Sequence, residues 1–241
     1  MDRVGQRRQQ AGQGATGPVR SFAAFALALI LLLALVAWIV LPGAGVVAGP
    51  AVLALVAGFA LRGMASGYPH PRFGVCNAVT LIRAALTAGL VSVLVASRET
   101  GWGVVAVAAA ALLLDGVDGW LARREGLVSA FGARFDMEVD ALLALVLAVS
   151  VLQQGKVGPW VLILGGLRYV YVAAGVFLPW LRRDLPPRWG RKTVCVVQIA
   201  TLIALLAPPV IPPMSLGLAA VATTLLVWSF AADVLWLWRR R

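Results

Sequence analysis

Four aspartates between residues 112 and 146 are the side chains of this sequence best suited to chemistry. Asp115 and Asp118 lie at the end of one long apolar run, and Asp136 and Asp140 lie near the start of the next. An ionised carboxylate inside a bilayer costs about 3 kcal/mol or more unless a cation meets it. If the four are gathered together, they must either take up protons or bind hard divalent cations such as Mg²⁺, which prefer oxygen ligands.

The spacing places these aspartates on two helical faces, because residues i, i+3, i+4 and i+7 of a helix share a face. The first face contains Asp115, Asp118, Gly119 and Ala122, and the second contains Gly132, Asp136 and Asp140. The short connection between the two runs predicts antiparallel neighbours, so the two faces can meet. Small residues beside the carboxylates leave room for a phosphate-bearing ligand next to a metal, which favours metal binding over protonation.

Other interpretations of the same residues stay open at this point. Small residues in membrane helices also serve close helix packing. The aspartates could form structural salt bridges with Arg123, Arg124 and Arg134. They could also belong to a divalent-cation transporter, although an ion pathway needs acidic residues at mid-membrane depth. Here the carboxylates gather at one end of the spans, and only Asp233 lies elsewhere in a late span.

The elements that must position these residues are long apolar helices. The chain is 61% hydrophobic with a mean hydropathy of +0.90, and many of its apolar runs approach or exceed the roughly 18 residues needed to cross a bilayer. We expect an all-α, polytopic membrane helix bundle with about eight spans. The expected spans are Phe22–Leu41, Val46–Leu61, Asn77–Ala96, Gly103–Gly119, Ala133–Gln153, Pro159–Pro179, Thr193–Ala207 and Leu216–Leu237.

The net charge of +11 is a topology signal, because the basic residues are one-sided. Seventeen of the 21 lysines and arginines fall on the N-terminal tail, alternate loops and the C-terminus, whereas Arg98 and Lys156 fall on the opposite side. The positive-inside rule therefore places both termini and the aspartate-rich loop in the cytoplasm, as expected for a plasma or inner membrane protein. The charge also suits contact with anionic membrane lipids. Nothing in the sequence resembles a module that binds nucleic acid.

Composition divides the chain into three parts. Residues 1–20 are rich in Gln, Gly and Arg and predict a disordered basic cytoplasmic tail. Residues 21–67 hold two spans without polar residues suited to chemistry, and they predict an extra transmembrane hairpin. Residues 68–241 hold the remaining six spans and all four aspartates.

The aspartate segment resembles the signature of the CDP-alcohol phosphotransferase (CDP-alcohol phosphatidyltransferase) family at every fixed position. In this chain the pattern reads Asp115-x-x-Asp118-Gly119-x-x-Ala122-Arg123, then eight residues, then Gly132-x-x-x-Asp136-x-x-x-Asp140. So many constrained positions rarely coincide by chance. The resemblance implies a six-helix catalytic core that transfers a substituted phosphoryl group from a CDP-linked donor to an alcohol and releases CMP.

The resemblance also implies roles for these residues. The aspartates of the family hold divalent metal, usually two ions, so we expect Mg²⁺ or Mn²⁺ here. By carry-over, Asp115, Asp118 and Asp136 are metal ligands, and Asp140 is the general base and a contact of the second metal. The residues implied for the CDP site are Gly119, Ala122, Arg123 and Gly132.

Two flanking segments resemble the family more loosely. Asn77-x-x-Thr80-x-x-Arg83 matches a stripe that opens the first core helix in many members, which adds Asn77 and Thr80 to the expected CDP site. Arg83 lies within a span, so it should find a carboxylate or a phosphate. The segment from Arg188 to Gln198 resembles a basic loop of phosphatidyltransferase members, with Arg188, Arg191 and Lys192 as candidates for acceptor binding. The same basic residues equally fit a positive-inside loop.

The sequence therefore predicts a phosphatidyltransferase of phospholipid biosynthesis. Its expected substrates are CDP-diacylglycerol and a polar alcohol, and the resemblance allows a homodimer. Transfer from a soluble CDP-amino alcohol to diacylglycerol is the alternative within the same family. A divalent-cation transporter is the alternative from a different class.

Overall fold

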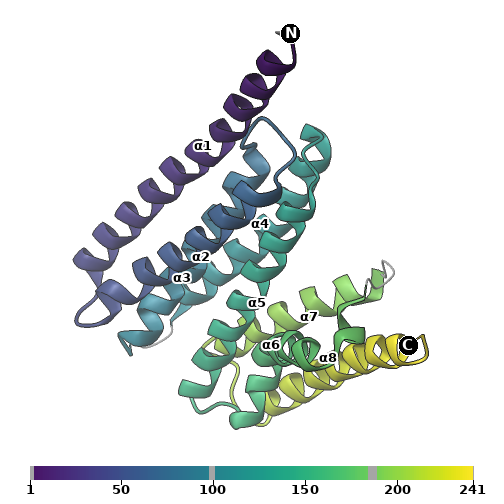
Figure 1. The fold of residues 1–241 in the computed structure, drawn as a ribbon. Coiled ribbons are helices and arrows are strands. Elements are labelled where there is room, and N and C mark those ends of the chain that lie inside the picture. Colours follow the sequence, from purple (N-terminus) through teal and green to yellow (C-terminus); the bar gives the residue numbers. More distant parts are fainter. Residues whose placement is uncertain (1–2, 98–100, 184–188, 241) are drawn as a thin grey trace. The chain divides into compact units, whose positions relative to one another are not determined.

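Every described element of this protein is a helix. The computed structural model describes residues 3–97, 101–183 and 189–240, with side chains described from Gly17 onward except that of Trp189. The α-helices of this part are α1 (Arg3–Val40), α2 (Gly45–Gly67), α3 (Val75–Val95), α4 (Trp102–Glu125), α5 (Ala130–Gln153), α6 (Leu162–Phe177), α7 (Trp189–Leu206) and α8 (Met214–Trp238). Short 3₁₀ helices at Pro159–Val161 and Pro179–Arg182 flank α6. The all-α prediction is confirmed (Figure 1).

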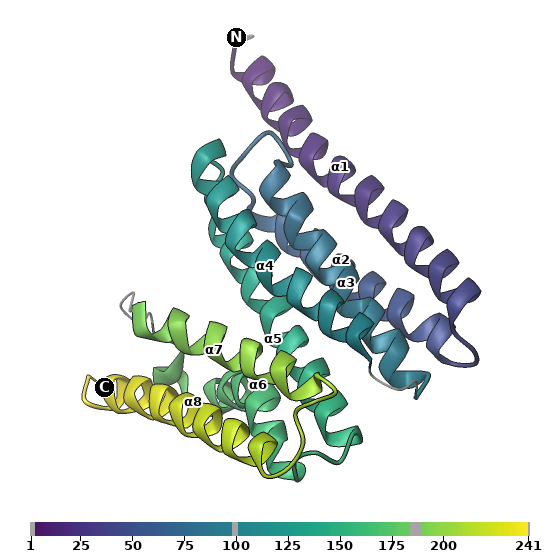
Figure 2. The same cartoon turned by 180° about the vertical axis from the view of Figure 1, so that it is seen from behind.

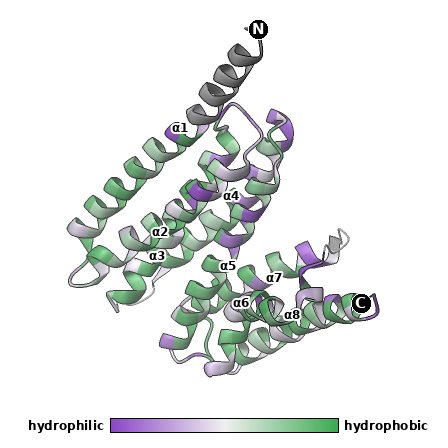
Figure 3. Ribbon diagram, viewed as in Figure 1, coloured by the Kyte–Doolittle hydropathy of each residue, from purple (hydrophilic) through white to green (hydrophobic). Residues whose placement is uncertain are grey.

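Each expected span coincides with one of these helices, and six of the described helices are long and apolar enough to cross a membrane. These six are α1, α2, α3, α4, α8 and α6 with the turn before it. The described lengths of α1 and α8 are mainly hydrophobic (Figure 3). The protein is thus a multi-pass membrane protein. Helices α5 and α7 are not among the six, and α5 carries the charged residues Arg134, Asp136, Glu138 and Asp140 in its first half.

The first compact unit comprises residues 1–98 and 113–139, so it holds α1 to α3, the second half of α4 and the start of α5. Within it, α1 lies beside α2 and α2 lies beside α3 (Figures 1 and 2). Its apolar core draws on all of these segments except α4. The fully or almost fully buried members include Phe22, Leu53, Ala57, Leu81, Ala84 and Val139. The two helices expected as an added hairpin therefore share one core with α3 and α5.

The approach of α2 to α3 is close because glycine faces the contact. The Gly49 N–H donates to the Ser92 hydroxyl at 3.0 Å. A Cβ atom at Gly49 would lie 2.2 Å from that hydroxyl oxygen and 2.4 Å from the Ala88 carbonyl oxygen. Only glycine fits there without a shift of one helix.

The second compact unit comprises residues 99–112 and 140–241, so it holds the rest of α4 and α5 together with α6 to α8. Lys156 donates to the Leu205 and Ala207 carbonyls at 3.1 and 2.7 Å, which satisfies the C-terminal end of α7. The Ser215 hydroxyl donates to the Lys156 carbonyl at 2.8 Å and ties the start of α8 to the same loop.

The expected disorder of residues 1–20 falls mainly on residues whose side chains lie outside the described part. Helix α1 is assigned from Arg3 onward, and its membrane-crossing length begins at Gly17.

Candidate functional site

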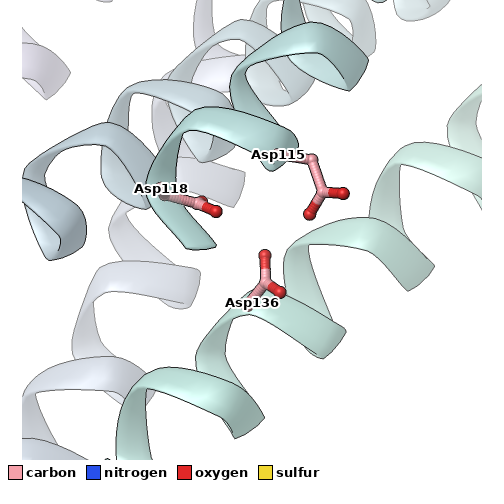
Figure 4. A group of neighbouring side chains, drawn as sticks. All are labelled: Asp115, Asp118 and Asp136. Atoms are coloured by element: carbon pink, nitrogen blue, oxygen red, sulfur yellow. The ribbon is translucent and has the colours of Figure 1, made fainter. Parts of the chain in front are cut away.

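Three of the four signature aspartates converge in the first unit. Asp115 and Asp118 lie one turn apart on α4, and Asp136 lies on α5. Their carboxylates point toward one another (Figure 4), with one oxygen of each within 4.8 Å of the others. Asp118 is buried, and the other two are partly exposed. The prediction that the α4 and α5 faces meet is confirmed for these three residues.

Arg83 of α3 lies against all three carboxylates. Its side chain is fully buried, and its guanidinium lies 3.1 Å from Asp115 Oδ1 and 2.8 Å from Asp118 Oδ2. It also pairs with Asp136 Oδ1. The expectation that Arg83 finds a carboxylate is therefore confirmed. One positive charge faces three negative ones, so the group keeps a formal charge of −2 when all three aspartates are ionised.

The start of α3 is fixed to the end of α4. This contact sets the position of Arg83 along the α3 axis relative to the aspartates. The Glu125 carboxylate accepts hydrogen bonds from the Val75 and Cys76 N–H groups at 3.3 and 3.4 Å, so it caps the N-terminus of α3. Gly74 precedes that helix with φ +76°, and a Cβ atom there would lie 2.3 Å from Leu127 Cδ1. The turn into α3 thus needs glycine.

Thr80 adds a hydrogen bond from the same helix. Its hydroxyl oxygen lies 3.0 Å from Asp118 Oδ2 and 3.1 Å from the Cys76 carbonyl oxygen, two acceptors that share one hydrogen. Thr80 was expected in the CDP site, and the structure places it against the carboxylate group. Asp118 consequently has partners on two successive turns of α3, Thr80 and Arg83.

The start of α5 is held by Ser129. The Gly132 N–H donates to the Ser129 hydroxyl at 3.0 Å, which is the hydrogen bond that an N-cap serine makes to the third residue of a helix. This cap fixes the first turn of α5 and places Asp136 one turn farther along. Gly132 itself adds no side chain to the space around Asn77.

The carboxylate group suits a divalent cation in donor type and in charge. All three side chains offer hard oxygen ligands, as Mg²⁺ and Mn²⁺ prefer. One carboxylate oxygen from each of the three residues lies within 4.8 Å of the others, which is close enough for all three to contact one ion. A single divalent cation would balance the remaining formal charge of −2. The protein therefore contains an acidic group able to hold a divalent metal.

Asp140 lies one helical turn after Asp136 on α5 and begins the later segment of the second unit. Among the described residues, the group of converging carboxylates contains Asp115, Asp118 and Asp136 and does not include Asp140.

The residues expected at the CDP site lie on the three helices of the carboxylate group. Gly119, Ala122 and Arg123 follow Asp118 on α4, and a Cβ atom at Gly119 would meet only Arg123 Nη1, at 3.6 Å. Asn77 and Gly132 lie together, because a Cβ atom at Gly132 would be 3.8 Å from Asn77 Oδ1. The structure thus brings α3 and α5 together at Asn77 and Gly132 and leaves space at Gly119.

The candidate acceptor residues belong to the second unit, apart from Arg188, which lies outside the described residues. Arg191 of α7 pairs with Asp233 of α8, with Nε 3.0 Å from Oδ2 and Nη2 3.5 Å from Oδ1. Asp233, the isolated acidic residue of the late span, thus has a basic partner. Lys192 is exposed at the start of α7.

Tyr68 and Glu125 contact site residues without having been expected to do so. The Asn77 amide donates to the Tyr68 hydroxyl at 2.9 Å, and Glu125 caps α3 as described above. Neither residue belongs to a spacing pattern. The signal that could have drawn attention to Glu125 is a carboxylate placed two residues after Arg123 at the end of a membrane-crossing helix.

The model of one protein family matches most of the chain. The family is described as CDP-alcohol phosphatidyltransferase, and the match covers residues 73–234. It includes all four aspartates and leaves α1 and α2 outside. No curated protein and no solved structure gives a significant match.

Proposed function

Since this chain belongs to the CDP-alcohol phosphatidyltransferase family, we propose that it transfers a phosphatidyl group from CDP-diacylglycerol to a polar alcohol and releases CMP. The observation that carries this proposal is the convergence of Asp115, Asp118 and Asp136 around Arg83. Family membership by itself establishes the coarser activity, which is transfer of a phosphoryl-alcohol group from a CDP-alcohol.

A diacylated donor suits the surroundings of the carboxylates. Asp115 and Asp118 lie on α4, which is long and apolar enough to cross a membrane, and they lie toward its C-terminal end. A lipid donor can place its diphosphate at that depth while its acyl chains stay in the bilayer. The same argument favours CDP-diacylglycerol over a soluble CDP-amino alcohol.

Arg83 prepares the carboxylates for the donor by holding one oxygen of each. A buried guanidinium in contact with three carboxylates fixes their spacing before any ligand arrives, so little reorganisation is needed on binding. Asp115, Asp118 and Asp136 would hold Mg²⁺ or Mn²⁺. When bound, the metal supplies charge neutralisation for the diphosphate and for the departing CMP. Arg123 and the space at Gly119 would accept the nucleotide half of the donor.

Asp140 is the proposed general base. Its carboxylate takes the proton of the acceptor hydroxyl while the acceptor oxygen forms a bond to the phosphorus that carries diacylglycerol. The bond from that phosphorus to the CMP oxygen then breaks, and CMP leaves. Because Asp140 lies one turn beyond Asp136 on α5, a hydroxyl on that side of the donor can reach it.

The polar acceptor is proposed to meet Arg191 and Lys192 at the start of α7, with Arg188 as a further candidate. Asp233 holds the Arg191 guanidinium by its Nε edge, which fixes the direction of the remaining donors. An acceptor that carries a phosphate would suit these basic side chains best. We place this reaction at the cytoplasmic face of the plasma or inner membrane, on the grounds of the basic residue distribution.

The decisive experiment measures CMP release by the purified protein. CDP-diacylglycerol is supplied with a panel of alcohols, and the lipid product is identified by mass. Activity should need Mg²⁺ or Mn²⁺, and Asp140→Asn should lower kcat by roughly the 10²–10⁴-fold typical of general-base loss. Glu138→Gln is the matched control, because Glu138 lies on the same helix outside the aspartate face.

Each other outcome points to a different function. Release of CMP only when a soluble CDP-amino alcohol meets diacylglycerol would assign the alternative reaction. Full turnover in chelated buffer would contradict the metal site. Metal uptake into vesicles without any CMP release would support the transporter.

A further inference from the structure

We propose that Tyr68 is a positioning residue of the nucleotide site, and that it turns the oxygen of the Asn77 side chain toward the nucleoside of the CDP donor. Tyr68 lies between α2 and α3 and precedes the family match, which begins at residue 73. The inference rests on the proposed function, because it assigns a task in binding the CDP donor.

The direction of the Asn77 side chain follows from its partners. Nδ2 lies 2.9 Å from the Tyr68 hydroxyl oxygen and also contacts the Phe73 carbonyl oxygen. A backbone carbonyl can only accept a hydrogen bond, so the atom that faces Phe73 must be the nitrogen. Both amide hydrogens then have partners. Within the described part of the chain, Asn77 Oδ1 has no hydrogen-bond donor assigned to it.

The Oδ1 atom lies beside Gly132, which has no side chain. A Cβ atom at Gly132 would lie 3.8 Å from Oδ1, and the Ser129 cap holds Gly132 in place. Asn77 is 4% exposed, so a ligand donor that reached Oδ1 would form a hydrogen bond largely shielded from water. Thr80, one turn farther along α3, touches Asp118 of the carboxylate group. An acceptor for the nucleoside therefore lies one turn from the residues that would hold the diphosphate.

Tyr68 is itself held in place. Its hydroxyl lies 3.0 Å from the Arg72 carbonyl oxygen and 3.3 Å from that of Phe73, to which it can donate its hydrogen. Its ring packs edge-on against Phe131 and His70, with centroid distances of 5.6 and 5.3 Å. Burial raises the pKa of the Tyr68 phenol, so it keeps its proton and remains a donor. A series of hydrogen bonds thus runs in one direction, from the Asn77 amide to the Tyr68 hydroxyl and from that hydroxyl to a backbone carbonyl.

As a hydrogen-bond acceptor, Asn77 Oδ1 would recognise a hydrogen-bond donor on the nucleoside. Two donors of cytidine are the candidates here, the exocyclic amine of the base and the 2′-hydroxyl of the ribose. Uracil has a carbonyl oxygen where cytosine has the amine. A uracil base would therefore place that oxygen against Asn77 Oδ1, and two acceptors cannot form a hydrogen bond with each other. Sites built to form one buried hydrogen bond discriminate strongly against an analogue that lacks the partner.

The test is Tyr68→Phe, which removes the hydroxyl and keeps the ring. Calorimetry in detergent with Mn²⁺ measures the affinities for CDP, UDP and 2′-deoxy-CDP. Loss of one orienting hydrogen bond should weaken CDP binding by roughly 2- to 10-fold and leave Mn²⁺ binding without nucleotide unchanged. If Oδ1 meets the amine, the preference for CDP over UDP should shrink. If it meets the ribose, the preference for CDP over 2′-deoxy-CDP should shrink instead.

Two controls separate this role from a general effect on the fold. Tyr171→Phe makes the same change in α6, where the hydroxyl donates to the Leu181 carbonyl at 3.1 Å, and it should leave all three affinities unchanged. In an Asn77→Ala background, Tyr68→Phe should have no further effect on CDP binding, because the group that it orients is gone.

Unchanged CDP affinity in Tyr68→Phe would overturn the inference, as would an equal loss for all three nucleotides. An undiminished effect of Tyr68→Phe in the Asn77→Ala background would also overturn it. If the wild-type protein bound none of the nucleotides, the proposed function itself would fail, which is a distinct result.

Discussion

Arg83 is the residue on which the carboxylate group depends most. It is fully buried and faces Asp115, Asp118 and Asp136, so it offsets one of three negative charges and spaces all three. Removing one partner of a buried ionic group typically costs about 3–5 kcal/mol, because the remaining charges stay buried without compensation. The stability of the metal-free protein should therefore reveal the role of this guanidinium directly.

Arg83→Gln should lower the thermal unfolding temperature strongly in chelated buffer and less in Mn²⁺. The reason is that a bound cation replaces part of the missing positive charge and stabilises the folded state by mass action. Unfolding in detergent, followed with and without the metal, measures both effects. Arg62→Gln is the control, because Arg62 is an exposed arginine on α2. An equal loss of stability in both buffers would show that Arg83 serves packing and not the charge balance of the site.

Gly119→Ala should leave stability unchanged or slightly raised while it weakens nucleotide binding. Inside α4 the change favours the helix by up to about 1 kcal/mol, and the added Cβ atom would meet only Arg123 Nη1, at an ordinary 3.6 Å. Any loss of CDP affinity must then arise because the added Cβ atom occupies space that the ligand needs. CDP affinity and the unfolding temperature, measured on the same preparation, check both halves. Unchanged CDP affinity would show that Gly119 is an ordinary helix residue with no role in nucleotide binding.

The helices show which parts of this structure can be predicted from sequence. Apolar length gave the spans, and 3.6-residue periodicity gave the faces that bring Asp115, Asp118 and Asp136 together. Both signals are local, because they depend on residues within a few turns. The bonds that align the helices are not local. Glu125 caps a helix that starts 50 residues before it, and Arg191 pairs with a residue 42 positions away. Such pairings follow from the packing of helices and have no spacing signature.

The contact between α2 and α3 gives a prediction at the scale of whole helices. Gly49→Ala should destabilise the protein by roughly 1–3 kcal/mol, because the new Cβ atom would lie 2.4 Å from the Ala88 carbonyl oxygen and must push the helices apart. Gly58→Ala on the same helix is the matched control, since no atom would lie within 4 Å of its Cβ. Thermal unfolding should separate the two variants, with Gly58→Ala neutral or stabilising. If both behaved alike, the close approach of α2 to α3 would not contribute to stability.

At the scale of the whole molecule, the basic residues and the helices together predict a sidedness. Seventeen of the 21 lysines and arginines fall on one side if all eight helices cross the membrane. Six of the described helices meet the length and apolarity needed, and α5, with four charged residues in its first half, is not among them. The crossing of α5 is therefore the step on which the topology depends. If α5 did not cross, its two ends would lie on the same side.

Single cysteines at three exposed positions test this topology. Val128→Cys lies between α4 and α5, Gln153→Cys lies at the end of α5, and Ala44→Cys lies between α1 and α2. Cys195, the exposed native thiol, is first replaced by serine. In intact cells, an impermeant thiol reagent should label Gln153→Cys and Ala44→Cys, and it should reach Val128→Cys only after the membrane is opened.

Labelling of Val128→Cys from outside would reverse the predicted orientation. Protection of Gln153→Cys while Ala44→Cys is labelled would show that α5 does not cross. The reversed orientation would also change the side from which the proposed polar acceptor must reach Asp140.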